Sequence, residues 1–360
     1  MTATTPVAAD QIVADLVAAD LVAADLVLAG RGILAADESG PAMDARLRQA
    51  GVAAGAESRR AYREMLVTTP GLSLGISGVI LGDETFRGRA SDGRSFPQAL
   101  ADRGLLPGIR VDTGPRPLAG APGETVTEGL DGLCSRLTGY FALGARFATW
   151  RAVLRTGDGR PSWRALRANA YALARYARAC QEAGLVAVVE VLIEGVPGAA
   201  RGREATCAAL MVTVIELADM GVALDGVVLA PNMVLPGASP EIVARQTLAA
   251  LSCVVPEEVP GVAFLSGGQN PAQATASLAA VRRLGAPWPV MFCFGRALTD
   301  PALAAWHGDP LCAAAGQRAL AGRVACNIAA LRGCYTPVLE PSYVLASGLG
   351  GRASGPAASG

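Results

Sequence analysis

Charged residues stand within or just after several apolar runs of this 360-residue chain. Asp37 follows the run GILAA, and Glu190 lies in the run Val186–Ile193. Carboxylates in such places can move protons as general acids or bases. Arg110 and Arg151 stand at the ends of two further runs, and a guanidinium group can stabilise developing negative charge. We therefore interpret Asp37, Glu190, Arg110 and Arg151 as candidate catalytic residues.

A second group of residues is suited to holding an anion. Glycine-rich turns offer backbone N–H groups, and arginine offers a forked donor that matches phosphate. The chain has such turns at Ser266–Gly267 and at Gly295–Arg296, and a further arginine, Arg46, in the phrase ARL. The sequence predicts an oxyanion site at these residues.

Each candidate also has a structural interpretation. Asp37 can cap a helix or pair with Arg151, and Glu190 can be a buried structural carboxylate. Glu194, farther along the same strand face, is either a relocated acid or base or a solvated loop residue. Cys293 is either a nucleophile or a small buried hydrophobe.

All 31 basic residues are arginine, and the chain contains no lysine. A lysine Schiff base, a lysine general base and a P-loop lysine are therefore excluded for its own side chains. The 31 acidic residues balance the charge to zero, which leaves no basic footprint for nucleic acid. We expect a small anionic or polyhydroxylated ligand, and neither nucleic acid nor a membrane as partner.

The cysteines and the two termini indicate the class of protein. Eight cysteines lack CxxC spacing and one histidine is present, so we expect reduced buried thiols in a cytoplasmic protein without a metal or cofactor. The start of the chain repeats VAADL, and its regularly spaced aspartates argue against a signal peptide or membrane span. We expect an alanine-rich helix over residues 1–30 and a flexible tail over residues 341–360.

Short apolar runs alternate with longer segments of helical period between these ends. The pattern predicts strands at Gly32–Glu38, Leu72–Leu81, Gly108–Asp112, Ala145–Leu154, Val186–Ile193, Leu224–Ala230, Val262–Ser266 and Val290–Phe294, and helices such as Trp163–Ala183 and Pro240–Val254. Eight such strands, each followed by a helical stretch, favour an α/β fold, a single parallel (β/α)8 TIM barrel over residues 31–340. In that fold the carboxyl ends of the strands form the active-site face, where the candidate residues stand.

The strand-end phrases resemble the class I fructose-1,6-bisphosphate aldolases, which act through a lysine Schiff base. The similar phrases include GRGILAADES, GVILGDETF, GIRVDTG, ARFATWRAVL, APNMVLPG, FLSGGQ and FGRAL, in family order over nearly the whole chain. The resemblance implies the same barrel.

The resemblance also implies roles for most of the candidate residues. It assigns one phosphate of the substrate to Ser266, Gly267, Gly295 and Arg296. Asp37 matches the acid or base of the first strand, and Arg46 lies near that phosphate. Ser39, Arg110 and Arg151 lie toward the distal end of the substrate.

Several positions depart from the family pattern. Ala230 stands where the family has its Schiff-base lysine, Thr149 where it has a second active-site lysine, and Leu192 where it has the acid/base glutamate. Arg110 replaces a third lysine, and Cys293 replaces a serine. The resemblance therefore carries over the barrel and the anion site, but not the Schiff base.

These departures lead to two functional hypotheses. We favour a repurposed enzyme in which acid/base and arginine electrostatic catalysis act, without a Schiff base, on a reactive carbonyl or sugar-phosphate-like substrate. Aldol addition, condensation, cyclisation, isomerisation and dehydration, in specialised metabolism, are the candidate reactions. The alternative is an inactive homologue that binds a phosphorylated ligand or a protein partner. The resemblance implies a homo-oligomer, either a tetramer or a dimer.

Overall fold

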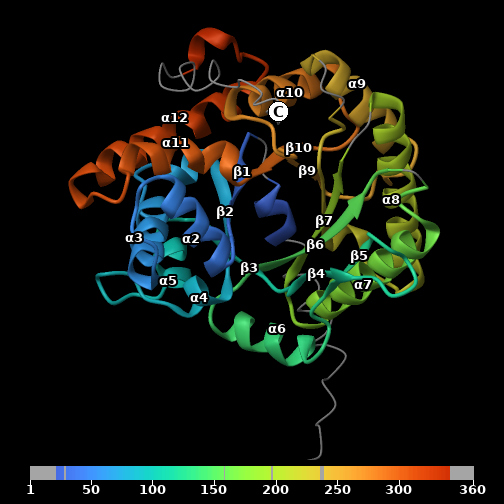
Figure 1. Cartoon of the computed structure of the whole chain (residues 1–360), viewed down its shortest axis with the longest axis horizontal. Coiled ribbons are helices and arrows are strands. Elements are labelled where there is room, and N and C mark those ends of the chain that lie inside the picture. The colour runs from blue at the N-terminus through green and yellow to red at the C-terminus, as the bar shows by residue number, and fades with distance from the viewer. Residues whose placement is uncertain (1–21, 28–29, 158, 196–197, 236–238, 341–360) are drawn as a thin grey trace, which may run out of the picture.

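The structure, a computed structural model, describes residues 22–27, 30–157, 159–195, 198–235 and 239–340. Within these ranges eight parallel strands close into a barrel in the order β1-β10-β9-β8-β7-β6-β3-β2, with helices around it (Figure 1). The strands are β1 Gly32–Ala36, β2 Ile76–Leu81, β3 Leu106–Arg110, β6 Phe147–Arg155, β7 Val186–Glu194, β8 Val227–Pro231, β9 Val262–Leu265 and β10 Val290–Phe294. The predicted (β/α)8 barrel is therefore confirmed.

The helices of the outer layer cover the apolar outer faces of the strands. They are α2 Gly40–Gln49, α3 Ala56–Val67, α4 Asp83–Arg87, α5 Phe96–Ala101, α6 Leu133–Ala142, α7 Trp163–Glu182, α8 Ala199–Asp219, α9 Pro240–Leu251, α10 Pro271–Leu284, α11 Arg296–Trp306 and α12 Ala313–Leu331. Local sequence sets several of their starts. Asn270 and Gln273 form a capping box at the start of α10, and the Ser162 hydroxyl accepts from the third residue of α7.

The predicted strands are all present, and those expected from Leu72, Ala145 and Leu224 begin later, at Ile76, Phe147 and Val227. The runs that start at Leu72 and Leu224 open with short 3-10 turns, Leu72–Leu74 and Leu224–Gly226, before β2 and β8 begin. Leu72 belongs to the core and Leu224 packs against it, whereas Leu74 is 75% exposed, so periodicity alone does not separate these turns from the strands. The helices expected from Trp163 and Pro240 start as predicted and end one and three residues early.

The sequence pattern did not predict the antiparallel hairpin of β4 Gly114–Pro117 and β5 Thr125–Glu128. Its first strand reads GPRP, and proline and glycine are poor strand formers. The hairpin is anchored beside β6, because the hydroxyls of Thr125 and Thr127 donate to the carbonyls of Val153 and Arg151 at 3.1 and 2.7 Å. It therefore flanks the strand that carries Arg151.

A separate cluster of apolar side chains fills the inside of the barrel. Its described members include Ile33, Ala35, Ile80, Phe147, Val186, Val188, Val228, Ala230, Ala263, Met291 and Cys293. The Phe147 ring occupies so much of this space that a Cβ at Gly108 would lie 2.2 Å from it. Glycine at position 108 is therefore needed for barrel closure around the ring.

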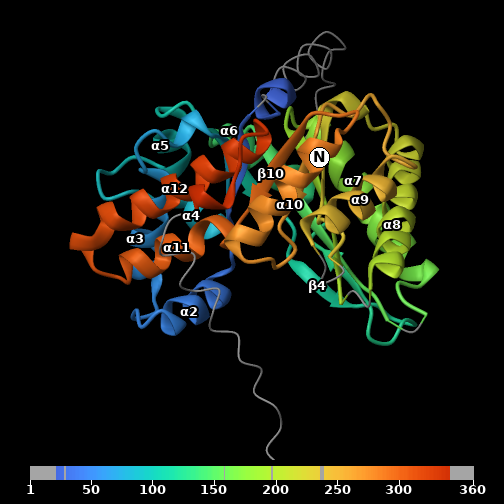
Figure 2. The same cartoon turned by 90° about the horizontal axis from the view of Figure 1, so that it is seen from above.

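Residues 22–26 form a helical turn that joins this inner cluster through Ala23 and Leu26. The Ser77 hydroxyl donates to the Leu26 carbonyl at 2.6 Å and holds the turn against β2. Figure 2 shows this turn, in dark blue, and α2 at opposite ends of the barrel. The amino end of the barrel is thus closed, and the candidate residues lie at the other end.

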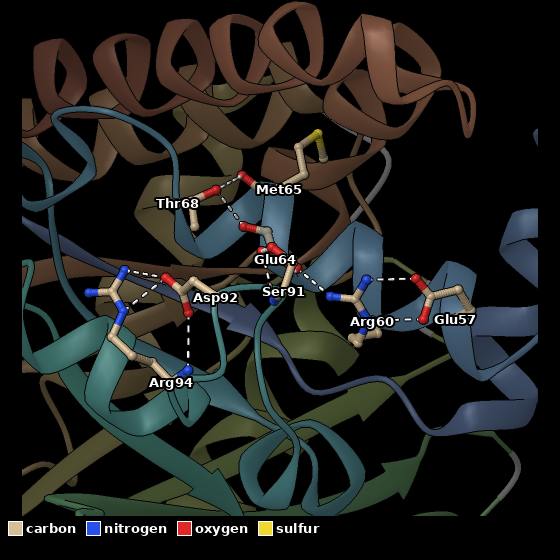
Figure 3. A network of polar contacts seen from close by, with 8 residues as sticks. All are labelled: Glu57, Arg60, Glu64, Met65, Thr68, Ser91, Asp92 and Arg94. Atoms are coloured by element: carbon tan, nitrogen blue, oxygen red, sulfur yellow. Dashed lines mark hydrogen bonds and ion pairs between the residues drawn. The ribbon is translucent and has the colours of Figure 1, made fainter.

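Arginine also holds parts of the outer layer together. On α3, Arg60 pairs with Glu57 at 2.6 Å and with Glu64, and Glu64 accepts from the Ser91 N–H at 3.1 Å (Figure 3). The loop before α5 is thereby fixed to α3 through the Glu64 carboxylate, which Arg60 holds in place.

Three further predictions concern the cysteines, membrane-spanning helices and the two ends of the chain. The thiols of all eight cysteines are free, but Cys134, Cys253 and Cys334 are exposed rather than buried as predicted. No helix in the described part of the chain is both long and apolar enough to cross a membrane. Most of the helix expected over residues 1–30, and the whole tail expected over residues 341–360, lie outside the described residues, so this domain division stays a prediction.

Candidate active site

A cavity of about 400 Å³ opens at the carboxyl ends of the barrel strands. We call it the mouth cavity. It gathers residues that are far apart in the sequence: Asp37, Glu38, Arg151, Leu192, Glu194, Ser266, Gly267, Cys293, Gly295 and Arg296. The structure therefore brings many of the sequence-predicted site residues to one place.

Asp37 directly follows β1 and lines this cavity, with its side chain 6% exposed. Its ion-pair partner is Arg110, whose Nη1 lies 3.5 Å from Asp37 Oδ2. This distance is long for a hydrogen bond, so the carboxylate keeps the capacity to accept one from a ligand hydroxyl.

Arg110 is held on the barrel wall and does not line the mouth cavity. Its Nε and Nη2 donate to both oxygens of Asp112, at 3.0 and 2.8 Å. Burial is the largest influence and disfavours the charged guanidinium, but the hydrogen bonds and charge of Asp112 together with the charge of Asp37 outweigh it and raise the pKa of Arg110. Asp112 also accepts from the Arg151 N–H at 3.1 Å. Asp112 thus occupies Nε and Nη2 of Arg110, Nη1 points toward Asp37, and the role of Arg110 toward a substrate stays a prediction.

Glu190 is fully buried on β7 and does not line the mouth cavity either. Arg151, its neighbour across β6 and β7, donates from Nε to Glu190 Oε2 at 2.5 Å. Burial raises the pKa of Glu190 although the Arg151 charge opposes it, and the Glu190 charge raises the pKa of Arg151. Glu190 therefore fixes Arg151, which does line the cavity, and a catalytic role for Glu190 itself stays a prediction.

Arg46 and Ser39 are also used inside the protein. Arg46 pairs with Glu38 and, at 2.6 Å, with Asp300 of α11. The Ser39 hydroxyl accepts from the Ala42 N–H and caps α2. Neither side chain lines the mouth cavity, because each already has partners from the protein. Their roles as phosphate contacts stay a prediction.

Glu38 is the anion at the centre of a cluster beside the cavity. Arg63 of α3 lies 2.7 Å from Glu38 Oε2, and Arg46 pairs with Glu38 Oε1. Burial alone would raise the pKa of Glu38, but the charges of Arg63 and Arg46 outweigh burial and lower it. Glu38 is therefore a fixed negative charge and a poor proton carrier near neutral pH.

The predicted anion-binding residues meet in the mouth cavity. Gly295 precedes α11 without a side-chain cap, so the N–H groups of the first turn are open to a ligand. Arg296 begins that helix and is exposed, and its guanidinium group has no hydrogen bond or ion pair within the described ranges. Ser266 and Gly267 follow β9, and Gly267 adopts a left-handed φ of 59° that glycine allows.

The three positions that depart from the family pattern lie inside or above the barrel. Ala230 is fully buried in the inner cluster, in register with Glu190. Thr149 is buried, and its Oγ1 has no hydrogen-bond partner within the described residues. Leu192 lines the mouth cavity. None of the three supplies an amine or a carboxylate.

Cys293 and Glu194 both line the mouth cavity, and their roles stay predictions. Cys293 is 2% exposed, and burial raises the pKa of its thiol well above the usual range, which disfavours the thiolate. The Glu194 side chain ends β7, is 45% exposed and lies 3.6 Å from Arg155.

Sequence analysis missed three residues that organise the site: Arg63, Asp112 and Asp300. Asp112 carried a signal, since it closes the third strand phrase. Arg63 and Asp300 lie on helices and meet the site only through folding. In the described residues, no three His, Cys, Asp or Glu side chains are arranged to hold a metal ion.

Comparison with known proteins decides the family. A sequence model described as fructose-bisphosphate aldolase class-I matches residues 19–345. The chain belongs to this family. A probable fructose-bisphosphate aldolase class 1 of Xylella fastidiosa is 48% identical over 290 residues, which cover 78% of this chain and 87% of the relative. The cytosolic fructose-bisphosphate aldolase 6 of Arabidopsis thaliana is 45% identical over 315 residues, 85% of this chain and 88% of the relative.

A crystal structure of the same family has the same fold. It is the fructose-bisphosphate aldolase of Plasmodium falciparum in complex with TRAP and a small molecule inhibitor. The TM-score is 0.88 at 35% sequence identity, and the match covers 93% of this chain and 99% of that one. The resemblance to class I fructose-bisphosphate aldolases in the strand-end phrases is confirmed.

The aldolase relatives overturn our functional hypothesis. The prediction of a repurposed enzyme with a new reaction in specialised metabolism is wrong, because relatives 45–48% identical are named fructose-bisphosphate aldolases and favour a conventional aldolase function. The alternative of an inactive homologue has no support from them either. That prediction gave three substituted positions more weight than the rest of the chain.

Proposed function

We propose that this chain is a lyase that catalyses the reversible aldol cleavage of a phosphorylated ketose. The shared name of its relatives supports the reaction. The observation that carries the proposal is the unpaired Arg296 guanidinium beside the open start of α11 and the Ser266–Gly267 turn. A helix N-terminus, backbone donors and a guanidinium fork together suit a phosphate group.

The other residues of the mouth cavity are suited to the proton and charge movements of an aldol cleavage. As the carbon–carbon bond breaks, one fragment loses a hydroxyl proton and the other gains a proton on carbon. Asp37 is the group assigned to this transfer, because it lines the cavity and its contact with Arg110 is long. Arg151, oriented by Glu190, is assigned to the substrate oxygen that gains negative charge.

We also propose that no imine forms on a lysine of this chain. Position 230 is alanine, position 149 is threonine, and the 360 residues contain no lysine. After treatment with ketose phosphate and borohydride, intact mass and peptide mapping should show no modified side-chain amine. A trapped side-chain imine would overturn this part of the proposal without affecting the phosphate site.

We propose in addition a cytoplasmic location and a homo-oligomer. The cytosolic isozyme from Arabidopsis thaliana supports the location. The oligomer, a dimer or tetramer, stays a prediction from the family resemblance, and light scattering of the purified chain would measure it.

The direct test is cleavage of fructose 1,6-bisphosphate, followed through a dehydrogenase that consumes the triose phosphate product. We expect product from the unaltered chain and much less from Asp37→Asn, which cannot carry the proton. Arg116→Gln is the matched control, since Arg116 is 61% exposed outside the mouth cavity. A chain that binds the ligand but yields no product in either direction would contradict the proposal.

A further inference from the structure

Arg151 stands where β6 continues beyond its neighbour β3. The two strands stay paired as far as Arg110 and Thr149, and β3 ends there. At Arg151 the backbone N–H and carbonyl on this side of β6 therefore have no strand to pair with. Backbone groups inside a protein need hydrogen-bond partners, so the groups that satisfy these two also fix the place of Arg151.

Two side chains take the place of the missing strand. Asp112 Oδ2 accepts from the Arg151 N–H at 3.1 Å, and the Thr127 hydroxyl donates to the Arg151 carbonyl at 2.7 Å. The Asp112 side chain is fully buried, and Thr127 is 2% exposed. The backbone of Arg151 is thus held from two directions, by the segment after β3 and by β5 of the hairpin.

Thr127 is itself held in place by Asn169 of α7. The Asn169 Oδ1 accepts from the Thr127 N–H at 3.1 Å, and its Nδ2 donates to the Thr125 carbonyl at 2.8 Å. Asn169 is only 1% exposed, so water does not compete for these bonds. The position of the Thr127 hydroxyl is therefore set by α7, one layer out from the barrel.

The side chain of Arg151 is held at one atom. Its Nε donates to Glu190 Oε2 at 2.5 Å, and its two terminal nitrogens have no hydrogen bond within the described residues. The side chain is 26% exposed and lines the mouth cavity. Both terminal nitrogens are thus available to a ligand oxygen, and their place depends on the backbone that carries them.

We infer that Thr127 is a positioning residue for Arg151, and that the β4–β5 hairpin fixes this guanidinium group for the reaction. The inference rests on the proposed function, in which Arg151 stabilises a substrate oxygen that gains negative charge. Such stabilisation needs a donor that is already in place, and a displacement of about 1 Å can cost about 100-fold in rate. The hairpin belongs to the catalytic apparatus although none of its residues lines the mouth cavity.

Two threonines of β5 provide a matched test. Thr127→Val removes the hydroxyl that reaches Arg151, and Thr125→Val removes the one that donates to the Val153 carbonyl, two residues farther along β6. Both changes should lower the urea midpoint, because each leaves a backbone carbonyl without its partner. In the cleavage of fructose 1,6-bisphosphate, we expect kcat to fall about 10-fold in Thr127→Val with KM within about twofold of the parent. In Thr125→Val both constants should stay within about twofold.

Thr127→Ser retains the hydroxyl and should keep kcat within about twofold of the parent. Equal losses of kcat in the two valine variants, an unchanged kcat in Thr127→Val, or a serine variant as slow as Thr127→Val would overturn the inference and leave the proposed function standing. A change confined to KM would overturn it too, since positioning for the transition state acts on kcat. No cleavage by the unaltered chain would instead overturn the proposed function, on which the inference rests.

Discussion

Arg296 differs from the other arginines of the barrel mouth because no carboxylate of the described residues lies within ion-pair distance of its guanidinium, although its charge acts on the nearby Asp300. Such a residue contributes little to folding and is available to a ligand. Asp37 resembles it in having only one long contact, with Arg110. Glu38 and Glu190 are opposite cases, since each is buried against a guanidinium group. Fixed charges and available charges thus lie side by side in one site.

We predict that Arg296→Gln weakens binding of inorganic phosphate and of ketose phosphates by about 10- to 100-fold, because a charged hydrogen bond is lost. The free energy of unfolding should change by less than about 0.5 kcal/mol, as at other exposed positions. Calorimetry and urea unfolding would measure the two quantities. Equal phosphate affinity in the variant and the parent would refute the assignment of Arg296.

Glu190 has a raised pKa, and this makes stability depend on pH. Below its usual pKa of 4.5, both the folded and the unfolded state hold the proton, so the contribution to stability is fully present. As the pH rises, the unfolded state releases the proton first, and stability is lost until the pH passes the folded-state pKa. Glu190→Gln carries no titratable carboxyl at this position, so its stability does not fall with rising pH for this reason.

We therefore predict that the parent's stability relative to Glu190→Gln falls as the pH rises from 4.5 toward neutrality. Urea unfolding at a series of pH values would show it. Glu258→Gln, at an exposed glutamate, is the control, and its difference from the parent should show no such fall. A difference that stays constant or grows for Glu190→Gln would contradict the raised pKa.

At the scale of elements, a buried ion pair joins α12, the start of α10 and the end of the described chain. Arg323 of α12 pairs with Glu340, and both side chains are almost fully buried. The same guanidinium donates to the Pro271 carbonyl at 2.7 Å, and Tyr335 donates to Glu340 at 2.8 Å. Since α10 follows the Ser266–Gly267 turn, this pair helps to fix the anion-binding residues.

We predict that Arg323→Met and Glu340→Leu each cost about 3–5 kcal/mol in the free energy of unfolding, because each leaves a buried charge without its partner. The double variant should cost less than the sum, since it leaves no unpaired charge. Arg283→Met, at a 60% exposed arginine of α10, should cost under about 1 kcal/mol. Additive losses in the double variant would show that the pair does not act as a unit.

At the scale of the whole molecule, the barrel is closed around a few large side chains. Phe147 lies so near β2 and β3 that a Cβ would come within 2.7 Å of its ring at Gly78 and within 2.2 Å at Gly108. The apolar layer at this level separates the residues 22–26 turn from the mouth cavity. The geometry of the mouth cavity therefore depends on how the apolar side chains pack inside the barrel, toward its amino end.

We predict that Gly108→Ala lowers the free energy of unfolding by about 1–3 kcal/mol through overpacking against Phe147. In a Phe147→Leu background the same change should cost less, which a double-variant cycle by urea unfolding would measure. Gly139→Ala on α6, where an added Cβ meets nothing, should instead be neutral or stabilising. An equal cost of Gly108→Ala in both backgrounds would exclude the ring as its cause.

The barrel, the anion-binding turns and the absence of a lysine amine can all be predicted from the amino-acid sequence. Eight apolar runs separated by helical segments leave few other folds, and the turns at Ser266 and Gly295 are local features. The tertiary structure alone decided which charges are available. Arg46 pairs with Asp300, which lies 254 positions away in the sequence. Asp112 accepts a hydrogen bond from Arg110 and holds it on the barrel wall, outside the lining of the mouth cavity. Sequence periodicity indicates whether a side chain is buried. The ion-pair partner of that side chain depends instead on how separate strand ends and helices come together in space.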